Sequence, residues 1–355
     1  MDIRELFTPA EIAANWTEVY SNQIPYLGTG LFPSRKKAGL DLAWFKGSKG
    51  LPVSLMPSTF DAQATFRDRI GLEKLETEMP FFREGFKIKE KDRQELLRIQ
   101  ESNDPYAEAI LARIYDDANE LIAGADVVAE RMRMQLLFPV GGDLGIVVKA
   151  NGVDYTYDYD PGDAWKTTNY TALSGTALWS ASATATPIAD IQRMKKAIRT
   201  ATGSEVAFAI MNDATLEKML AADEVINRFK TYNPTIVSAV TTDEELVQVI
   251  EAALKIRIIS YNKMYRDESK VAHTFVPDGY VALIPNGALG QTWYGTSPEE
   301  MDGRAAGADV AIVNTGVAIS RIVEPHPVNI NTIASEIVLP SFERVDEVGV
   351  LKVLA

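Results

Sequence analysis

Apolar residues recur every three or four positions along one long stretch of the chain, at about residues 105–137. This spacing predicts an amphipathic helix. Asn103 or Asp104 is placed to cap it and Pro105 suits its first turn, while Pro139 ends it. At 1.5 Å per residue the helix would be about 50 Å long, which exceeds a typical globular helix. We therefore expect a long, extended helix at 105–137, which we call the spine helix, and not a helix packed within one compact core.

The same pattern analysis predicts a compact α/β region from about 187 to 330. Helices are expected at 187–202, 213–229 and 243–254, and buried strands at 206–211, 256–261 and 280–284. Two closing strands, about 332–339 and 348–354, follow this region and are expected to return to an earlier sheet. After the spine, a strand with aromatic residues on one face is predicted at 153–160.

The first 95 residues have a different texture. A short helix is predicted from Pro9 to Tyr20, and the proline and glycine residues that follow argue against packed regular structure up to about residue 37. Residues 40–45 alternate weakly, 46–50 form a turn signal, and a highly charged return segment follows. This indicates a long, exposed β-hairpin. Because a two-stranded ribbon alone is marginal in water, we expect it to rest on something else, such as another subunit.

Composition narrows the function classes. The chain has 355 residues, 46% of them hydrophobic and 24% charged, as in a globular protein of about two domains. It has no cysteine, which excludes disulfides, thiolate catalysis and zinc–thiolate sites. The formal net charge of −13 disfavours tight binding to phosphate backbones. No signal peptide or membrane-spanning run is recognised, so a cytosolic, soluble product without membrane partners is expected.

No catalytic constellation stands out, and no cofactor is expected. Asp158, Asp160 and Asp163 faintly suggest a calcium loop, but the ligand order is not met, and a turn at a strand end is the better interpretation. Neither His273 nor His326 is accompanied by a serine or aspartate motif. The glycines form no dinucleotide fingerprint. The basic trio at 35–37 is expected to be a solvated arm. We therefore expect that the protein is not an enzyme.

Three pieces of the sequence resemble the major capsid proteins of tailed bacteriophages, in the lambda-like capsid protein E branch. They are Trp179, in an expected strand, leading into Thr186–Ile191; the stretch Phe275–Leu283; and the closing residues 337–355. None is a catalytic motif, so the resemblance depends on order and spacing over nearly the whole chain. The arm, the unsupported hairpin and the long helix would give a subunit of an assembly extra area for binding its neighbours, whereas a monomeric enzyme would gain nothing from them.

The resemblance implies an α+β fold of the Hong Kong 97 type, with residue ranges that can be placed on this chain. The expected parts are an N-terminal arm at 1–37, an extended loop at 38–95, a peripheral domain at 96–186 that includes the spine helix 105–137, an axial α/β domain at 187–334, and C-terminal strands at 335–355 that return to the peripheral domain.

The resemblance also implies a function and partners. The chain would be a major capsid protein that self-assembles into pentamers and hexamers of an icosahedral head shell around double-stranded DNA, which it encloses without specific binding. A scaffolding protein, a portal and a decoration protein are the other expected partners; fewer than 40 residues precede the extended loop, so the scaffold is expected to be a separate chain. Assembly is expected in the host cytoplasm, and the product in the virion head.

Site expectations concern contacts between subunits. The interface candidates are Trp44, Phe45, Lys46, Lys49, Arg67, Arg69, Trp293 and Tyr294. Gly124, inside the predicted spine helix, is a hinge candidate because a mid-helix glycine lowers the energy of bending; close packing against a strand is the equally weighted alternative. In some members of the resembling family, a lysine of the extended loop forms an isopeptide bond with an asparagine of a neighbouring subunit. Lys46 and Lys49 lie near the expected loop tip, but no partner asparagine or catalytic glutamate can be matched on this chain. Covalent cross-linking is therefore not expected.

Two rival functions stay open. The first keeps the fold but makes the chain the shell of a bacterial nanocompartment with an enzyme cargo. The second is an α/β enzyme that binds a small ligand in the 187–330 region, which predicts a monomer or small oligomer with a built pocket.

Overall fold

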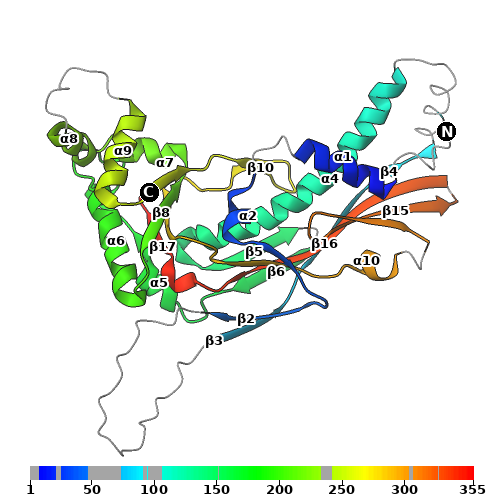
Figure 1. Ribbon diagram of the computed structural model, residues 1–355, viewed down its shortest axis with the longest axis horizontal. Coiled ribbons are helices and arrows are strands. Elements are labelled where there is room, and N and C mark those ends of the chain that lie inside the picture. Colours follow the sequence, from blue (N-terminus) through cyan, green and yellow to red (C-terminus); the bar gives the residue numbers. More distant parts are fainter. Residues whose placement is uncertain are drawn as a thin grey trace, which may run out of the picture. The chain divides into compact units, whose positions relative to one another are not determined.

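A computed structural model describes residues 8–20, 25–46, 73–90, 94, 106–150, 152–232, 242–303, 307–326 and 328–355. The chain forms two compact units, each built from segments that are far apart in the sequence (Figure 1). Unit 1 comprises Met1–Ala43, Glu76–Met132 and Gln291–Ser341, and unit 2 comprises Trp44–Leu75, Arg133–Gly290 and Phe342–Ala355. Within the described residues, no helix combines the length and the apolarity that a membrane crossing needs.

Unit 1 is organised by a six-stranded sheet in the order β1-β13-β16-β15-β14, with β4 also paired to β16. The central strand β16 is the longest, and it pairs antiparallel with both β15 and β4. The bounds are β1 (Ser34–Lys36), β4 (Phe81–Ile88), β13 (Gly290–Tyr294), β14 (Asp309–Val313), β15 (Val317–Pro325) and β16 (Val328–Phe342). The five-residue helix α10 (Pro298–Asp302) precedes β14.

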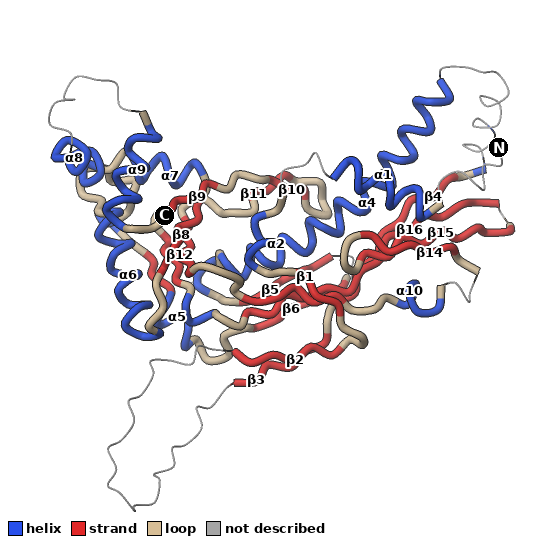
Figure 2. Tube along the Cα trace, in the orientation of Figure 1, coloured by secondary structure: helices blue, strands red, loops and turns tan. Residues whose placement is uncertain are grey.

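Two helices pack against this sheet. They are α1 (Pro9–Tyr20) and the long α4 (Tyr106–Leu137), and Figures 1 and 2 show both beside the strands of unit 1. Ile12 and Trp16 of α1 are 1% and 2% exposed, and they share one apolar cluster with Ile122 of α4 and with residues of β14, β15 and β16. The predicted helices at 9–20 and 105–137 are confirmed, and the expected arm carries a helix docked on its own chain.

The segment 25–37 differs from the prediction of irregular structure. It forms the short helix α2 (Leu27–Leu31) and the strand β1, which runs parallel to β13. The buried carboxylate of Glu130 accepts the Gly28 N–H at 2.9 Å, and Phe32 is fully buried. Lys36 of the basic trio forms an ion pair with Glu300 at 2.5 Å. The density of proline and glycine could not predict this regular structure, because Glu130 and Glu300, which hold the segment, lie more than 100 residues away in the sequence.

Unit 2 contains a five-stranded sheet in the order β7-β17-β12-β8-β9. The last strand in sequence, β17, lies between β12 and β7, antiparallel to the first and parallel to the second. β8 and β9 are parallel to each other. The bounds are β7 (Tyr170–Ala172), β8 (Val206–Met211), β9 (Arg257–Ser260), β12 (Tyr280–Pro285) and β17 (Gly349–Lys352).

Four helices and the sheet enclose the core of unit 2. The helices are α6 (Pro187–Thr202), α7 (Asp213–Leu220), α8 (Asp223–Tyr232) and α9 (Asp243–Leu254), and Figure 1 shows α6, α8 and α9 grouped beside β8 and β17. Val281 and Leu283 of β12 are fully buried in one cluster with residues of all four helices. The helix expected at 213–229 is two helices, because the chain turns at Ala221 and Ala222 before Asp223 starts α8.

Smaller elements complete the described fold. Three two-stranded sheets pair β2 (Asp41–Lys46) with β3 (Glu73–Glu78), β5 (Gly145–Ala150) with β6 (Val153–Asp158), and β10 (Met264–Arg266) with β11 (Ala272–Thr274). The remaining helix is α5 (Ala164–Asn169), and the short 3-10 turns are η1 (Val140–Gly142), η2 (Gly175–Ala177) and η3 (Val345–Glu347). Trp179 lies in a turn after η2, not in the strand that was expected.

The two compact units group the chain differently from the expected domains, whose boundaries stay a prediction. Residues 291–334, expected in the axial domain, belong to unit 1, and residues 133–186, expected in the peripheral domain, belong to unit 2. The two closing strands also separate: β16 enters the sheet of unit 1, whereas β17 completes the α/β sheet of unit 2. Sequence periodicity locates strands but does not say which sheet accepts them, and this explains the difference.

The expected extended loop is described only at its base. β2 and β3 pair as its two sides, and the return strand β4 is held along β16 from Phe81 to Ile88. The expected loop tip lies outside the described residues. The return strand of the loop is therefore paired within its own chain through β4, and contact of the loop with another subunit stays a prediction.

Candidate functional site

The carboxyl ends of the parallel strands β8 and β9 are the position where an α/β enzyme would bind its ligand. Here the polar groups bind one another. Ser260 donates its hydroxyl proton to the Asp213 carboxylate, and Asn262 donates to the Ser260 hydroxyl at 2.9 Å. Hydrogen bonds from Ser260 and Asn262 lower the pKa of Asp213 below its ordinary value. This carboxylate is a fixed acceptor in a strand–helix turn and not a free acid or base.

A neighbouring network gives the resembling stretch at 275–283 a structural role. Asn212 caps α7 by accepting the Thr215 N–H at 2.9 Å, and its amide donates to Asp278 at 2.5 Å. The Thr215 hydroxyl accepts the Gly279 N–H at 2.8 Å, and the Gly279 carbonyl accepts the Val353 N–H at 2.7 Å. The motif therefore ties α7 and the C-terminal segment together.

The acidic and histidine candidates also have structural explanations. The two carboxylate oxygens of Asp160 accept the N–H groups of Trp165 and Lys166 at 3.0 Å each, which caps α5. His273 is exposed and pairs with Asp267 at 2.9 Å, and His326 is exposed. Across the described residues, no group of three metal-ligating side chains converges. Asp158 and Asp160 accept backbone N–H groups within 158–166, as residues of a turn at a strand end do.

A shallow depression of about 790 Å³ lies at the amino ends of β8 and β9, opposite the edge where α/β enzymes bind ligands. Its cations include Lys195, Arg199 and Lys255. Lys195 donates to the Leu254 carbonyl at 3.0 Å, and Arg199 pairs with Glu205 at 3.2 Å. Two helices, α6 and α9, end here, and basic side chains stabilise the partial negative charge of helix C-termini. Helix capping accounts for this cluster without a ligand.

The predicted interface candidates of the extended loop have different outcomes. Trp44 is 7% exposed and its ring lies 5.2 Å from that of Tyr159, so it packs within unit 2. Phe45 and Lys46 are the last residues of β2. Lys49, Arg67 and Arg69 lie outside the described residues. That these residues form one interface stays a prediction.

Trp293 and Tyr294 lie in β13 within the sheet of unit 1. The Trp293 indole N–H donates to the Ser341 hydroxyl at 3.1 Å. Tyr294 is 5% exposed, and its side chain fills the space where a Cβ on Gly316 would stand. Tyr294 therefore offers no surface to a partner in this conformation.

Gly124 lies inside α4, which is continuous from Tyr106 to Leu137. It is exposed, and a Cβ built on it would have no atom within 4 Å. The alternative that Gly124 permits close packing against a strand is therefore wrong for this chain. The hinge interpretation stays a prediction.

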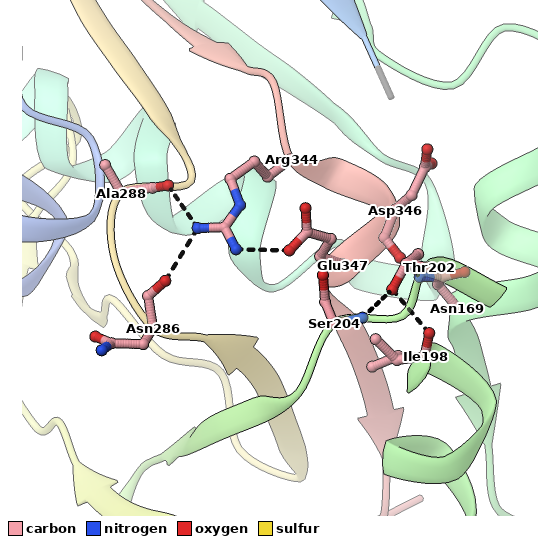
Figure 3. Close-up of polar contacts among 9 residues, drawn as sticks. All are labelled: Asn169, Ile198, Thr202, Ser204, Asn286, Ala288, Arg344, Asp346 and Glu347. Carbon is pink, nitrogen blue, oxygen red and sulfur yellow. Dashed lines mark hydrogen bonds and ion pairs between the residues drawn. The ribbon is translucent and has the colours of Figure 1, made fainter. Parts of the chain in front are cut away.

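A polar hub that sequence reasoning missed surrounds Arg344, as Figure 3 shows. Its guanidinium donates to the Asn286 and Ala288 carbonyls at 3.0 and 3.1 Å and pairs with Glu347 at 2.6 Å. Close by, Asn169 donates to the Asp346 and Val348 carbonyls at 2.8 Å each. The hub fastens the segment after β16 to the β12–β13 turn and to α5. No local signal reveals it, because the partners are joined only by tertiary contact.

We expect Arg344→Met to destabilise unit 2 by about 1–2 kcal/mol, because the hub loses three hydrogen bonds. Burial raises the pKa of Glu347, but hydrogen bonds from Arg344 and Ser204 outweigh it and hold the pKa below the ordinary 4.5. This contribution to stability is therefore present above about pH 4.5 and lost as the pH falls below it. Urea titrations at several pH values measure how the free energy of unfolding falls as the pH drops below about 4.5. This decrease should be absent in Arg344→Met and smaller than in the parent in Arg344→Lys. A Glu347 pKa that is unchanged in Arg344→Met would contradict the role of the hub.

Comparison with known proteins decides the family. The model of the phage major capsid protein E family matches residues 8–353. The chain belongs to the phage major capsid protein E family. Comparison with curated protein sequences finds no match.

Solved structures agree with this capsid family in fold. A prophage protein from Escherichia coli CFT073 described as a capsid protein superposes with a TM-score of 0.59 at 14% identity, over 98% of this chain and 99% of that one. A phage-related protein from Bordetella bronchiseptica RB50 gives a TM-score of 0.56 at 13% identity, over 97% of both chains. The fold is of the Hong Kong 97 type, and the resemblance drawn from the sequence is confirmed.

Proposed function

We propose that this phage capsid protein assembles into pentamers and hexamers that tile an icosahedral head shell around double-stranded DNA. The observation that carries the proposal is the family match over residues 8–353. The site geometry supports it, because the edge of the α/β sheet where a ligand would bind is filled by internal hydrogen bonds among Asp213, Ser260 and Asn262. A structural subunit needs no such site.

The charge of the chain fits the enclosure of DNA without adhesion. A protein that binds DNA tightly gains affinity by releasing counterions at clustered lysine and arginine residues. A subunit with a net charge of −13 has little to gain in this way. DNA would then slide along the inner surface during packaging. Strong binding of DNA by purified capsomers at physiological salt would count against this part of the proposal.

Assembly in the host cytoplasm would require further proteins. We propose a scaffolding protein, a portal and a decoration protein as partners, and no covalent cross-link between subunits. Denaturing gels of mature particles test the absence of cross-links, because cross-linked shells would give a ladder of covalent oligomers.

Size-exclusion chromatography followed by negative-stain electron microscopy tests the proposed function. The expected products are five- and six-membered rings or closed shells. A chain that stays monomeric at millimolar concentration would overturn the proposal and favour a ligand-binding enzyme. The content of particles purified from infected cells separates the remaining rival, since DNA is expected here and an enzyme cargo would indicate a nanocompartment.

We also propose that the shell expands from a round precursor, as shells of this family do, and that α4 bends at Gly124 during this expansion. Gly124→Ala should stabilise the unassembled chain by about 1 kcal/mol, because alanine favours helix more than glycine and the added methyl group meets no atom within 4 Å. The same stiffening should slow the expansion of precursor shells. Urea titration measures the first effect, and time-resolved scattering measures the second. In the control Gly124→Ala/Glu120→Gly, the glycine moves by one turn and stability returns toward that of the parent. Normal expansion of Gly124→Ala shells would exclude the hinge.

A further inference from the structure

The turn between β12 and β13 contains an asparagine followed directly by a glycine, Asn286–Gly287. Both residues are exposed and lie outside the two strands, and Gly287 has a φ of +91°. The side-chain amide of an asparagine can be attacked by the backbone nitrogen of the next residue, and glycine obstructs this attack least because it has no Cβ. The pair therefore combines a reactive sequence with access to solvent.

The hub around Arg344 adds a feature that the sequence alone does not reveal. The Arg344 guanidinium donates to the Asn286 carbonyl at 3.0 Å and to the Ala288 carbonyl at 3.1 Å. Figure 3 shows the Asn286 carbonyl directed at the guanidinium and the side-chain amide of Asn286 directed away from it. The carbonyl of Asn286 and the N–H of Gly287 belong to one peptide group. A positive charge is therefore bound to the oxygen of the peptide group whose nitrogen would react.

We propose that Asn286 is a site of spontaneous deamidation in the folded chain and that Arg344 promotes the reaction. Loss of the Gly287 N–H proton leaves a negative charge that is shared between the Gly287 nitrogen and the Asn286 carbonyl oxygen. A cationic donor already in place on that oxygen stabilises this charge, as the donors of an oxyanion hole do for a developing alkoxide. The inference concerns the single chain, so it does not depend on the proposed function.

The reaction needs only solvent as a co-reactant. The Gly287 nitrogen forms a bond to the side-chain carbonyl carbon of Asn286, the bond from that carbon to the side-chain nitrogen breaks, and ammonia leaves with the proton that Gly287 lost. Water then adds to either carbonyl carbon of the cyclic succinimide and opens the ring. Water is consumed, ammonia is released and no atom is oxidised or reduced. The product at position 286 is aspartate or β-linked isoaspartate.

The modification changes the hub itself. In isoaspartate the main chain runs through the side-chain carbon atoms, so it is longer by a CH₂ group, and the former Asn286 carbonyl becomes a free carboxylate. This carboxylate competes for Arg344 with Glu347, which pairs with the guanidinium at 2.6 Å in the unmodified chain. Ageing of the protein thus converts a neutral acceptor of the hub into an anion.

Peptide mass spectrometry of the full chain, incubated at neutral pH, tests the inference. Trypsin releases Asn286 in the peptide 271–304, which contains no other asparagine. We expect this peptide to gain, with time, the mass that replacement of a side-chain NH₂ by OH produces, and we expect this in the native chain as well as in urea. A native chain that is not modified, although the same chain is modified in urea, would overturn the inference. This comparison needs no variant, so it holds even where a replacement prevents folding.

Replacement of Arg344 separates activation of the peptide group from simple restraint of the turn. Arg344→Met should slow the modification of Asn286 in the native chain by about tenfold, because it removes the charged donor, and should leave the rate in urea unchanged. Arg344→Lys, which keeps the positive charge, should give an intermediate rate. If Arg344 only restrained the turn, Arg344→Met would loosen it and Asn286 would react faster. An equal or faster rate in native Arg344→Met would therefore overturn the inference.

A second Asn–Gly pair in the chain, Asn151–Gly152, supplies the internal control. Trypsin releases it in the peptide 150–166, which also contains a single asparagine. The rate at Asn151 should be the same in the parent and in Arg344→Met, so a slower reaction confined to Asn286 assigns the effect to the hub. An equal slowing at both asparagines would overturn the role of Arg344 and with it the inference.

Discussion

Replacement of Trp179 by alanine should destabilise unit 2 by about 3–5 kcal/mol, the largest effect that we expect from a single side chain. Trp179 is 1% exposed and packs in the core cluster formed by α6, α7, α8, α9 and the sheet. Its indole N–H donates to the Asp190 carboxylate at 3.2 Å, and its backbone N–H donates to the Val353 carbonyl at 3.0 Å. The alanine variant would leave both a cavity and a buried carboxylate without this donor.

Trp179→Phe separates these two losses. Phenylalanine retains most of the ring volume but has no N–H, so we expect Trp179→Phe to destabilise the chain by about 1–2 kcal/mol. Burial raises the pKa of Asp190, and the bonds from Trp179 and Arg193 partly offset it. Both variants should therefore raise this pKa further. The free energy of unfolding of the unassembled chain, from urea titration, measures the difference. Equal losses for Trp179→Ala and Trp179→Phe would show that the cavity contributes little.

Gly279→Ala should destabilise the chain by about 2–5 kcal/mol. Gly279 has a φ of +76°, a conformation that disfavours any Cβ by about 1–2 kcal/mol. A Cβ there would also stand 2.5 Å from the Leu354 Cβ, and such overpacking adds about 1–3 kcal/mol. The N–H and carbonyl of Gly279 hold Thr215 and Val353, so the backbone cannot move away without breaking these bonds.

Gly152→Ala is the matched control. Gly152 has nearly the same φ, +78°, but a Cβ there would meet no atom within 4 Å. We expect Gly152→Ala to destabilise the chain by about 1–2 kcal/mol, the energy of placing a residue with a Cβ at this positive φ. The difference between the two variants, measured by urea titration, isolates the clash with Leu354. Because Leu354→Gly removes the two nearest atoms, the Leu354 Cβ and Cγ, the double variant Gly279→Ala/Leu354→Gly should show a favourable coupling energy. Equal losses at the two glycines would contradict this account.

Local signals in the sequence predicted the helices well. The helix at 243–254 is confirmed to the residue, and Thr242 caps it in a capping box with Glu245. The helix at 187–202 likewise begins at Pro187 and ends at Gly203, where φ is +77°. Each of these signals involves residues within one or two turns of one another, so a linear pattern is sufficient to detect it.

Pairing between distant strands could not be predicted in the same way. β1 lies parallel to β13, with Arg35 opposite Trp293, and β4 lies along β16, with Phe86 opposite Thr332. Strand patterns report burial and period but not the identity of the neighbour. The same limit hid the hub at Arg344, since its carbonyl partners in the β12–β13 turn carry no side-chain signature. Whether Trp293 and Tyr294 contact another subunit stays a prediction, since the pairing of β13 shows only where they lie within this chain.

The position of β17 has a consequence for synthesis of the protein. Residues 349–352 form an inner strand of the five-stranded sheet, between β12 and the edge strand β7. A nascent chain on the ribosome therefore cannot complete this sheet until these late residues have emerged, although β7, β8 and β12 have long been translated. Prematurely terminated products would lack the strand that joins the two sides of the sheet. Such a product would leave β7 without its parallel partner and β12 with an unpaired edge.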